Sequence, residues 1–221
     1  MDIKKQSVTY TTTNTYETLN TLGNKTENVW LVLHGMGYLS RYFLRYFVKL
    51  NPEENYIIAP QAPSKYYLKD DFKHVGASWL TKEDTLLETE NVLNYLNEVL
   101  RHEKEILEKK LIVFGFSQGV SIAMRWLAQR KLHCQTLVLY AGGIPNELKK
   151  QDFEFLDFSK TKVKIVYGNK DHYLTPKRLL SEYEKINTLF GEHAEIINFE
   201  GGHEINEAIL EKIASDSSLG V

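Results

Sequence analysis

Short runs of apolar residues alternate along this chain with longer stretches in which apolar residues recur every three or four positions. The short runs are typical of strands buried on both faces, and the longer spacing is typical of helices with one buried face. Strands that alternate with helices predict an α/β fold whose central sheet is mostly parallel, with helices on both faces. We expect strands at 29–33, 56–59, 111–114, 136–140, 163–167 and 194–199, and helices at 41–50, 81–102, 120–130, 175–190 and 205–213.

Three segments lie outside this alternation. Residues 7–22 are rich in Thr and Tyr, which predicts one or two antiparallel strands at a sheet edge. Residues 60–80 form a long irregular stretch, and such a stretch in a compact domain usually has a function. Residues 144–162 are a charged connector that contains three phenylalanines. At the helix starts, Ser40 is a candidate cap, and residues 81–84 resemble a capping box.

A glycine-flanked serine lies between the apolar run 111–114 and the helical pattern that follows it. Residues 115–119 read Gly-Phe-Ser-Gln-Gly, a match to G-x-S-x-G. A strand that turns abruptly into a helix strains the residue at its tip and crowds the residues two before and two after it. Glycine at both crowded positions removes the Cβ atoms that would clash. The motif therefore predicts that Ser117 is exposed as a nucleophile for acyl transfer.

A nucleophilic serine also needs hydrogen-bond donors for the negative oxygen of the tetrahedral intermediate. The helix N-terminus beside Ser117 has free backbone N–H groups, and the N–H of Gln118 is the first of them. A second donor is the backbone N–H of Met36, which follows His34-Gly35 at the end of the predicted strand 29–33. We therefore expect Met36 and Gln118 to form the oxyanion hole.

A base and an orienting acid follow the last two predicted strands. Asp171 comes after the strand 163–167, and His203 comes after the strand 194–199. In open α/β sheets, ligands bind at the carboxyl ends of the strands, so these side chains gather at the edge that carries Ser117. His203 would accept the serine proton, and Asp171 would hold the imidazole tautomer and stabilise the imidazolium. The chain order Ser, Asp, His is that of the α/β-hydrolases.

Other residues compete for these roles. The chain has seven histidines, and His172 is the strongest rival base because it adjoins Asp171. A side chain next to the acid usually points elsewhere, which favours His203. Asp152 and Asp157 are alternative acids, but neither follows a predicted strand. A metal site is less well supported, because the chain has no H-E-x-x-H motif and no pair of cysteines.

The charge balance argues against a polyanionic partner. The 221 residues include 27 basic and 29 acidic side chains, for a formal net charge of −2 and a pI near 6.4. Neither nucleic acid nor an anionic membrane is therefore indicated as a partner. The single cysteine, Cys134, has no partner for an intrachain disulfide. No apolar run long enough to span a membrane and no N-terminal signal core are present, so we expect a cytoplasmic protein.

Several motifs together resemble the phospholipase/carboxylesterase family of α/β-hydrolases, which includes small bacterial carboxylesterases and acyl-protein thioesterases. The similarity extends over residues 28–214, and the G-F-S-Q-G elbow is its most specific part. The other matching motifs are Leu33-His34-Gly35, Pro60-Gln61-Ala62-Pro63, Trp79, Gly168-x-x-Asp171 and Gly202-His203.

This resemblance implies an α/β-hydrolase fold in a single domain, residues 1–221, with a triad of Ser117, Asp171 and His203. It also implies an oxyanion hole at Met36 and Gln118, and a carboxylic-ester hydrolase that needs no cofactor. A thioesterase with the same triad is the nearest alternative, because one triad cleaves both bond types. A binding protein with this fold and little turnover is the alternative outside the enzymes.

The surroundings of the site are less well defined by the sequence. The connector 144–162 is too short for a helical cap domain, which predicts an open or lightly covered cleft. Four aromatic residues of the stretch 60–80 either line the substrate pocket or only pack that stretch onto the domain: Tyr66, Tyr67, Phe72 and Trp79. We expect the partner to be a small ester or thioester, and a homodimer is possible.

Overall fold

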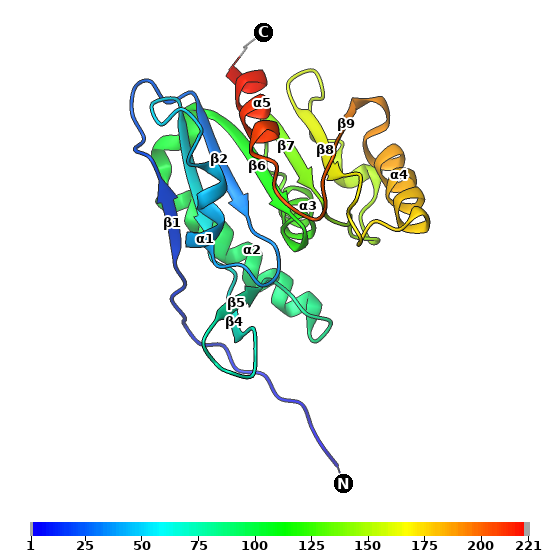
Figure 1. Ribbon diagram of the computed structural model, residues 1–221. Helices are drawn as coiled ribbons and strands as arrows, with labels where there is room; N and C mark the ends of the chain where they lie inside the picture. Colours follow the sequence, from blue (N-terminus) through cyan, green and yellow to red (C-terminus); the bar gives the residue numbers. More distant parts are fainter. Residues whose placement is uncertain (1, 219–221) are drawn as a thin grey trace.

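The computed structural model describes residues 2–218, except for the side chains at 105, 107, 217 and 218. Its centre is a seven-stranded sheet in the order β1-β3-β2-β6-β7-β8-β9 (Figure 1). The edge strand β1 is antiparallel to β3, and the other neighbouring strands are parallel. The strands are β1 (Tyr16–Leu19), β2 (Asn28–Leu33), β3 (Asn55–Pro60), β6 (Lys110–Phe116), β7 (Thr136–Tyr140), β8 (Lys162–Gly168) and β9 (Ala194–Phe199).

Helices cover both faces of the sheet, as the alternating pattern predicts. One apolar core joins the sheet to α2 (Thr85–His102), α3 (Gln118–Arg130) and α4 (Pro176–Phe190). A second core joins the other face to α1 (Ser40–Phe43), the 3-10 turn η1 (Leu44–Phe47) and α5 (Glu207–Ser218). The central strands are buried on both faces because each contacts both cores. The predicted α/β-hydrolase class, with a mostly parallel sheet, is confirmed.

The irregular stretch 60–80 is more ordered than its sequence suggests. It contains a two-stranded antiparallel hairpin of β4 (Ser64–Tyr67) and β5 (Val75–Ser78). All four residues of β4 are exposed, so the strand has no buried face and therefore no alternating pattern to reveal it. The hairpin leaves the sheet directly after β3, at the carboxyl end of the parallel strands (Figure 1).

Two predicted helix caps are wrong. Leu39 precedes α1, and the Ser40 hydroxyl donates to Gln61 Oε1 at 2.9 Å instead of capping the helix. The expected helix 41–50 is one α-helical turn followed by η1, with 3-10 geometry. Helix α2 begins at Thr85 rather than at residue 81, and the residue before it, Asp84, makes no side-chain cap.

The remaining segments are short. Of residues 7–22, only β1 is a strand, because residues 7–13 are exposed and pair with no other strand. The connector 144–162 contains the 3-10 turn η3 (Lys150–Phe153), whose Phe153 is buried in the core beneath α3 and α4.

Within residues 2–218, no cap domain covers the strand ends. In the same range no helix has the length and apolar character needed to cross a membrane. The 3-10 turns η2 (Lys104–Glu108) and η4 (Gly191–His193) complete the fold.

Candidate active site

Ser117 occupies a strained turn between β6 and α3. Its backbone has φ of 53° and ψ of −114°, and residues other than glycine rarely adopt a positive φ of this kind. The flanking glycines have no space for a side chain. A Cβ atom at Gly115 would lie 2.6 Å from the Gly119 carbonyl oxygen, and one at Gly119 would lie 2.0 Å from the Leu33 carbonyl oxygen. The structure therefore forms the elbow that the motif predicts.

The side chains of Ser117, His203 and Asp171 form one hydrogen-bonded chain. His203 Nε2 lies 2.9 Å from Ser117 Oγ, and His203 Nδ1 lies 2.7 Å from Asp171 Oδ2. A carboxylate only accepts hydrogen bonds, so we assign the ring proton to Nδ1, which leaves the Nε2 lone pair facing the serine hydroxyl. The arrangement joins a hydroxyl, a proton acceptor and a buried acid in the order that acyl transfer uses.

Asp171 and His203 are held by neighbouring loops. Asp171 is buried, and its second carboxylate oxygen accepts the backbone N–H of Tyr173 at 2.9 Å. The loop before His203 accepts the Lys170 backbone N–H at the Gly201 carbonyl oxygen, 2.8 Å away. The His203 ring contacts the rings of Phe116 and Tyr173, with centroid separations of 5.1 and 4.7 Å. These contacts fix the orientation of the imidazole.

The segments that carry Met36 and Gln118 both lie close to Ser117. A Cβ atom at Gly35 would lie only 3.1 Å from Ser117 Cβ, so the backbone beside Met36 passes close to the nucleophile. Gln118 is the first residue of α3. Within the described part of the chain, neither of the two backbone N–H groups takes part in a hydrogen bond. Both are therefore free to donate to a substrate oxygen.

The rival residues lie elsewhere. His172 is exposed and contacts the Tyr173 ring in a tilted arrangement, and its ring centroid is 6.4 Å from that of His203. Asp152 accepts the Lys149 backbone N–H and Asp157 accepts that of Ser159, so both carboxylates serve local turns of the connector. Among the described residues, no three His, Cys, Asp or Glu side chains form a group that could hold a metal ion.

A buried polar network supports the loop that carries Met36, and most of it was not predicted from the sequence. The Gln118 side chain accepts the Trp79 backbone N–H at 2.8 Å and donates to the Leu80 carbonyl at 2.7 Å. The Trp79 indole N–H donates to the His34 carbonyl at 2.8 Å. The sequence offered two signals for this network, the glutamine directly after Ser117 and the tryptophan at position 79, but nothing that connects them.

His34 follows a strand and lies at the site edge, yet its ring is fully buried. Nδ1 lies 2.8 Å from the Gly35 carbonyl oxygen, so Nδ1 carries the proton and Nε2 accepts the Ala62 backbone N–H at 3.1 Å. Burial lowers the pKa of His34 from 6.5 to about 4, because a charged imidazolium would lose its hydration. His34 is therefore a neutral link between the loop and residue 62.

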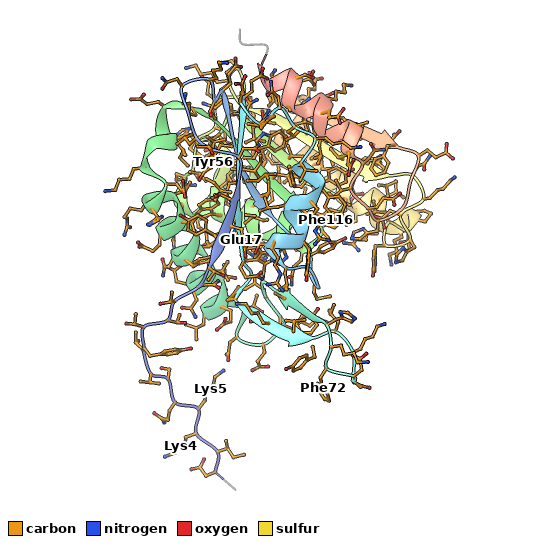
Figure 2. The ribbon with its side chains drawn as sticks, turned by 60° about the vertical axis from the view of Figure 1, so that its left-hand side comes forward. Lys4, Lys5, Glu17, Tyr56, Phe72 and Phe116 are labelled. Atoms are coloured by element: carbon orange, nitrogen blue, oxygen red, sulfur yellow. The ribbon has the colours of Figure 1, made fainter. Side chains whose placement is uncertain are left out.

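The four aromatic residues of the stretch 60–80 do not converge on one pocket. Trp79 is 0% exposed and belongs to the core. Tyr67 and Phe72 contact each other edge to face at 5.1 Å, toward the outer end of the hairpin. Figure 2 shows Phe72 well away from Phe116, the neighbour of Ser117. The Tyr66 hydroxyl would lie 3.8 Å from a Cβ atom at Gly37, so Tyr66 remains the candidate lining residue of the four.

A narrow apolar crevice lies beside the site, between the ends of β7 and β8 and helix α4. Leu139, Ile144, Leu174 and Leu179 are among its lining residues, and its volume is about 20 Å³. That space is sufficient for about one water molecule. A long hydrocarbon chain therefore does not fit into the crevice without movement of its walls.

The sheet order, the strained serine elbow and the acid and histidine loops at neighbouring strand ends define an α/β-hydrolase. The chain belongs to the phospholipase/carboxylesterase family, whose model matches residues 14–218. The family resemblance read from the motifs is therefore confirmed, over a longer range than 28–214. Membership in this family supports an esterase or thioesterase type of hydrolase.

Solved structures with this fold come from plants and bacteria. Acyl-protein thioesterase 2 of Zea mays is 16% identical with a TM-score of 0.68, covering 93% of this chain and 98% of its own. A phospholipase/carboxylesterase of Dyadobacter fermentans is 20% identical with a TM-score of 0.66, covering 94% and 99%. The Bacillus cereus carboxylesterase is 16% identical with a TM-score of 0.63, covering 92% of each chain. A search of curated protein sequences found no match.

Proposed function

We propose that this protein is a serine hydrolase that cleaves carboxylic esters through an acyl-enzyme intermediate. The observation that carries the proposal is the position of His203, whose two ring nitrogens lie within hydrogen-bond distance of Ser117 Oγ and Asp171 Oδ2. Membership in the phospholipase/carboxylesterase family supports the same reaction class. No step of the proposed reaction requires a cofactor or a metal ion.

In the first half-reaction, Ser117 Oγ attacks the carbonyl carbon of the ester while His203 Nε2 takes the hydroxyl proton. The carbonyl oxygen becomes negative and accepts hydrogen bonds from the backbone N–H groups of Met36 and Gln118. One such donor typically contributes about 3–4 kcal/mol of transition-state stabilisation. The intermediate collapses when His203 returns the proton to the leaving alkoxide, and the acyl group remains on Ser117.

In the second half-reaction, a water molecule replaces the alcohol. His203 takes one of its protons as the water oxygen attacks the acyl carbon, which gives a second tetrahedral intermediate. The bond between the acyl carbon and Ser117 Oγ then breaks, His203 returns the proton to Oγ, and the carboxylic acid leaves. Asp171 stays ionised throughout and stabilises the imidazolium that forms in each half. Because Asp171 is buried and accepts a backbone N–H besides the imidazole, its orientation does not change between the halves.

The substrate we propose is a small-molecule ester, with a thioester as the alternative, because the same proton transfers release a thiol. Tyr66 is the aromatic residue we propose at the substrate edge, since its hydroxyl lies near Gly37. A single domain spanning 1–221, a cytoplasmic location and a possible homodimer stay predictions.

Active-site labelling tests the proposal directly. A fluorophosphonate probe should label the folded wild-type protein, and Ser117→Ala should remain unlabelled with an unchanged far-ultraviolet circular dichroism spectrum. A p-nitrophenyl ester series run beside an acyl-CoA series should then separate ester from thioester preference. Folded protein that takes no label and turns over neither series would contradict the hydrolase and favour a binding protein with this fold.

A further inference from the structure

The segment 171–178 runs from the acid of the triad to the first turn of α4 (Figure 1). Tyr173 is exposed in this segment, and its ring centroid lies 4.7 Å from that of His203. The Tyr173 backbone N–H donates to Asp171 Oδ1 at 2.9 Å, and its carbonyl accepts Arg178 Nη1 at 3.2 Å. The segment therefore holds a cation at the edge of the site, and the proposed reaction gives that cation no role.

A second series of contacts leads from the serine to Arg178. A Cβ atom at Gly142 would lie 2.3 Å from the Ser117 carbonyl oxygen, so the backbone after β7 packs against the serine elbow. One residue further on, a Cβ atom at Gly143 would lie 3.1 Å from Arg178 Nη2. Because position 143 is a glycine, no side chain from that residue covers Nη2. Arg178 therefore adjoins both the backbone that contacts Ser117 and the tyrosine that contacts His203.

The charge of Arg178 is not neutralised by the protein. Within residues 2–218, no carboxylate forms an ion pair with its guanidinium. Glu182 reaches the same space, since its Oε1 would lie 3.4 Å from a Cβ atom at Gly143. The Glu182 oxygens, however, already accept the Ile144 backbone N–H at 2.9 Å and the Lys185 ammonium group at 3.1 Å. Lys185 therefore offsets the charge of Glu182, and Arg178 keeps its own.

Helix α4 gains nothing from a cation at this position. Lys177 and Arg178 lie in its first turn, which contains no acidic residue. The free N–H groups make that end of a helix partly positive, so basic side chains there are disfavoured. The backbone N–H of Arg178 is itself capped by Thr175 at 3.3 Å, so the unused donors belong to the guanidinium. A cation that local electrostatics disfavours, with free donors beside a reactive serine, indicates a role in binding.

We propose that Arg178 is a specificity-determining residue that binds a carboxylate of the substrate, and that this protein prefers esters carrying such an anionic group. A planar guanidinium matches the two oxygens of a carboxylate, and these charge-assisted hydrogen bonds are stronger than neutral ones. The crevice of about 20 Å³ beside the site leaves no room for a long hydrocarbon chain, which agrees with a short, polar ester. This substrate class rests on the proposed ester hydrolysis, whereas carboxylate binding at Arg178 does not.

Binding without turnover tests the role of Arg178. In ligand-observed NMR titrations, Ser117→Ala protein should bind monomethyl glutarate about tenfold more tightly than methyl glutaramate, its neutral amide. Adding Arg178→Gln should abolish this preference. Adding Lys177→Gln, which removes one charge from the same helix turn, should leave it unchanged. A second pair, 3-acetoxypropanoate and 3-acetoxypropanamide, carries the carboxylate on the alcohol half, so the pair that shows the preference identifies the half that faces Arg178.

Three binding results overturn the proposal. The first is the absence of a preference for the carboxylate in both pairs. The second is a preference that persists after Arg178→Gln in protein that unfolds at the wild-type temperature. The third is an equal loss with Lys177→Gln, because the summed charge of the helix turn, and not the guanidinium contact, would then be responsible.

Hydrolysis separates this proposal from the proposed function. For the preferred pair, the ratio of kcat/KM for the acid to kcat/KM for the amide should be about ten in the wild type and about one in Arg178→Gln. Arg178→Lys should give an intermediate ratio, because it keeps the charge and loses the planar fork. Equal rates on acid and amide in the wild type overturn the role of Arg178 and leave the serine hydrolase intact. Carboxylate binding that needs Arg178, without turnover of any ester, supports the role of Arg178 and contradicts the hydrolase.

Discussion

Two histidines that follow strands of the same sheet have opposite environments. His203 is partly exposed, and its ring lies between a buried carboxylate and the strained serine. His34 is fully buried; its ring hydrogen-bonds the Gly35 carbonyl and the Ala62 N–H, and the Gln61 side-chain amide lies 3.5 Å from Nε2. The comparison shows that a position after a strand is enough to bring a histidine to the edge of the site. What the histidine does there depends on the hydrogen-bond partners of its two ring nitrogens. His203 is suited to move a proton, and His34 is suited to hold a loop.

The sharpest test of this comparison replaces each histidine in turn. His203→Ala should lower kcat for a p-nitrophenyl ester roughly 10⁶-fold, because no other described base faces Ser117 Oγ. His34→Gln should retain far more of the activity, since its ring does not reach the reacting atoms. Comparable losses in the two folded variants would show that the assigned roles are wrong.

The acid provides the next largest effect. Asp171→Asn should lower kcat roughly 10⁴-fold, because an amide in that position favours the imidazole tautomer whose proton is on the wrong nitrogen. The substitution preserves the size of the side chain, so the melting temperature should change little, and the loss of rate then does not come from unfolding. A variant that keeps most of its activity would remove Asp171 from the mechanism. Asp157→Asn, a carboxylate of the connector, is the matched control.

His34 should make the stability of the protein sensitive to acid. Its pKa is about 4 in the folded state and near 6.5 when unfolded, so between these values the unfolded chain binds more protons. The contribution of the neutral His34 ring to the free energy of unfolding is therefore fully present above pH 6.5, and it is lost as the pH drops toward 4. Urea unfolding at pH 7 and 4.5 should show a loss about 2–3 kcal/mol larger for wild type than for His34→Gln. Equal losses would contradict a neutral buried ring.

The smallest predicted effect concerns the indole that supports the His34 loop. Trp79→Phe keeps an aromatic ring in the core but leaves the buried His34 carbonyl without its 2.8 Å donor. We expect a loss of about 1–2 kcal/mol in the free energy of urea unfolding. Fluorophosphonate labelling of Ser117 should persist at a similar rate. Loss of labelling with unchanged stability would instead place Trp79 among the residues that act in the reaction.

The arrangement of the sheet and the meeting of three distant side chains were predictable, because both depend on patterns that buried strands impose. Continuous apolar runs locate β2, β6 and β7, and residues after such strands meet at one edge. The glycines of the elbow were predictable from sterics, and the structure leaves no room for a Cβ at either of them.

The hairpin and the helix starts were not predictable from the same patterns. Strand β4 is exposed along its whole length, so no alternation of apolar and polar residues marks it. Residues 81–84 spell a capping sequence, but Asp84 adopts a left-handed conformation and α2 starts after it. The supporting network of Gln118, Trp79 and His34 depends on contacts between segments remote in sequence, which short motifs do not encode.

The distance in sequence between Ser117 and His203, 86 residues, has a consequence for the protein during its synthesis. At about 5–20 residues per second, a ribosome adds the histidine some 4–17 s after the serine. During that interval the nascent chain already contains the elbow residues but lacks the imidazole that would draw a proton from them. Premature release anywhere between these two positions therefore yields a fragment that carries the serine without its proposed base.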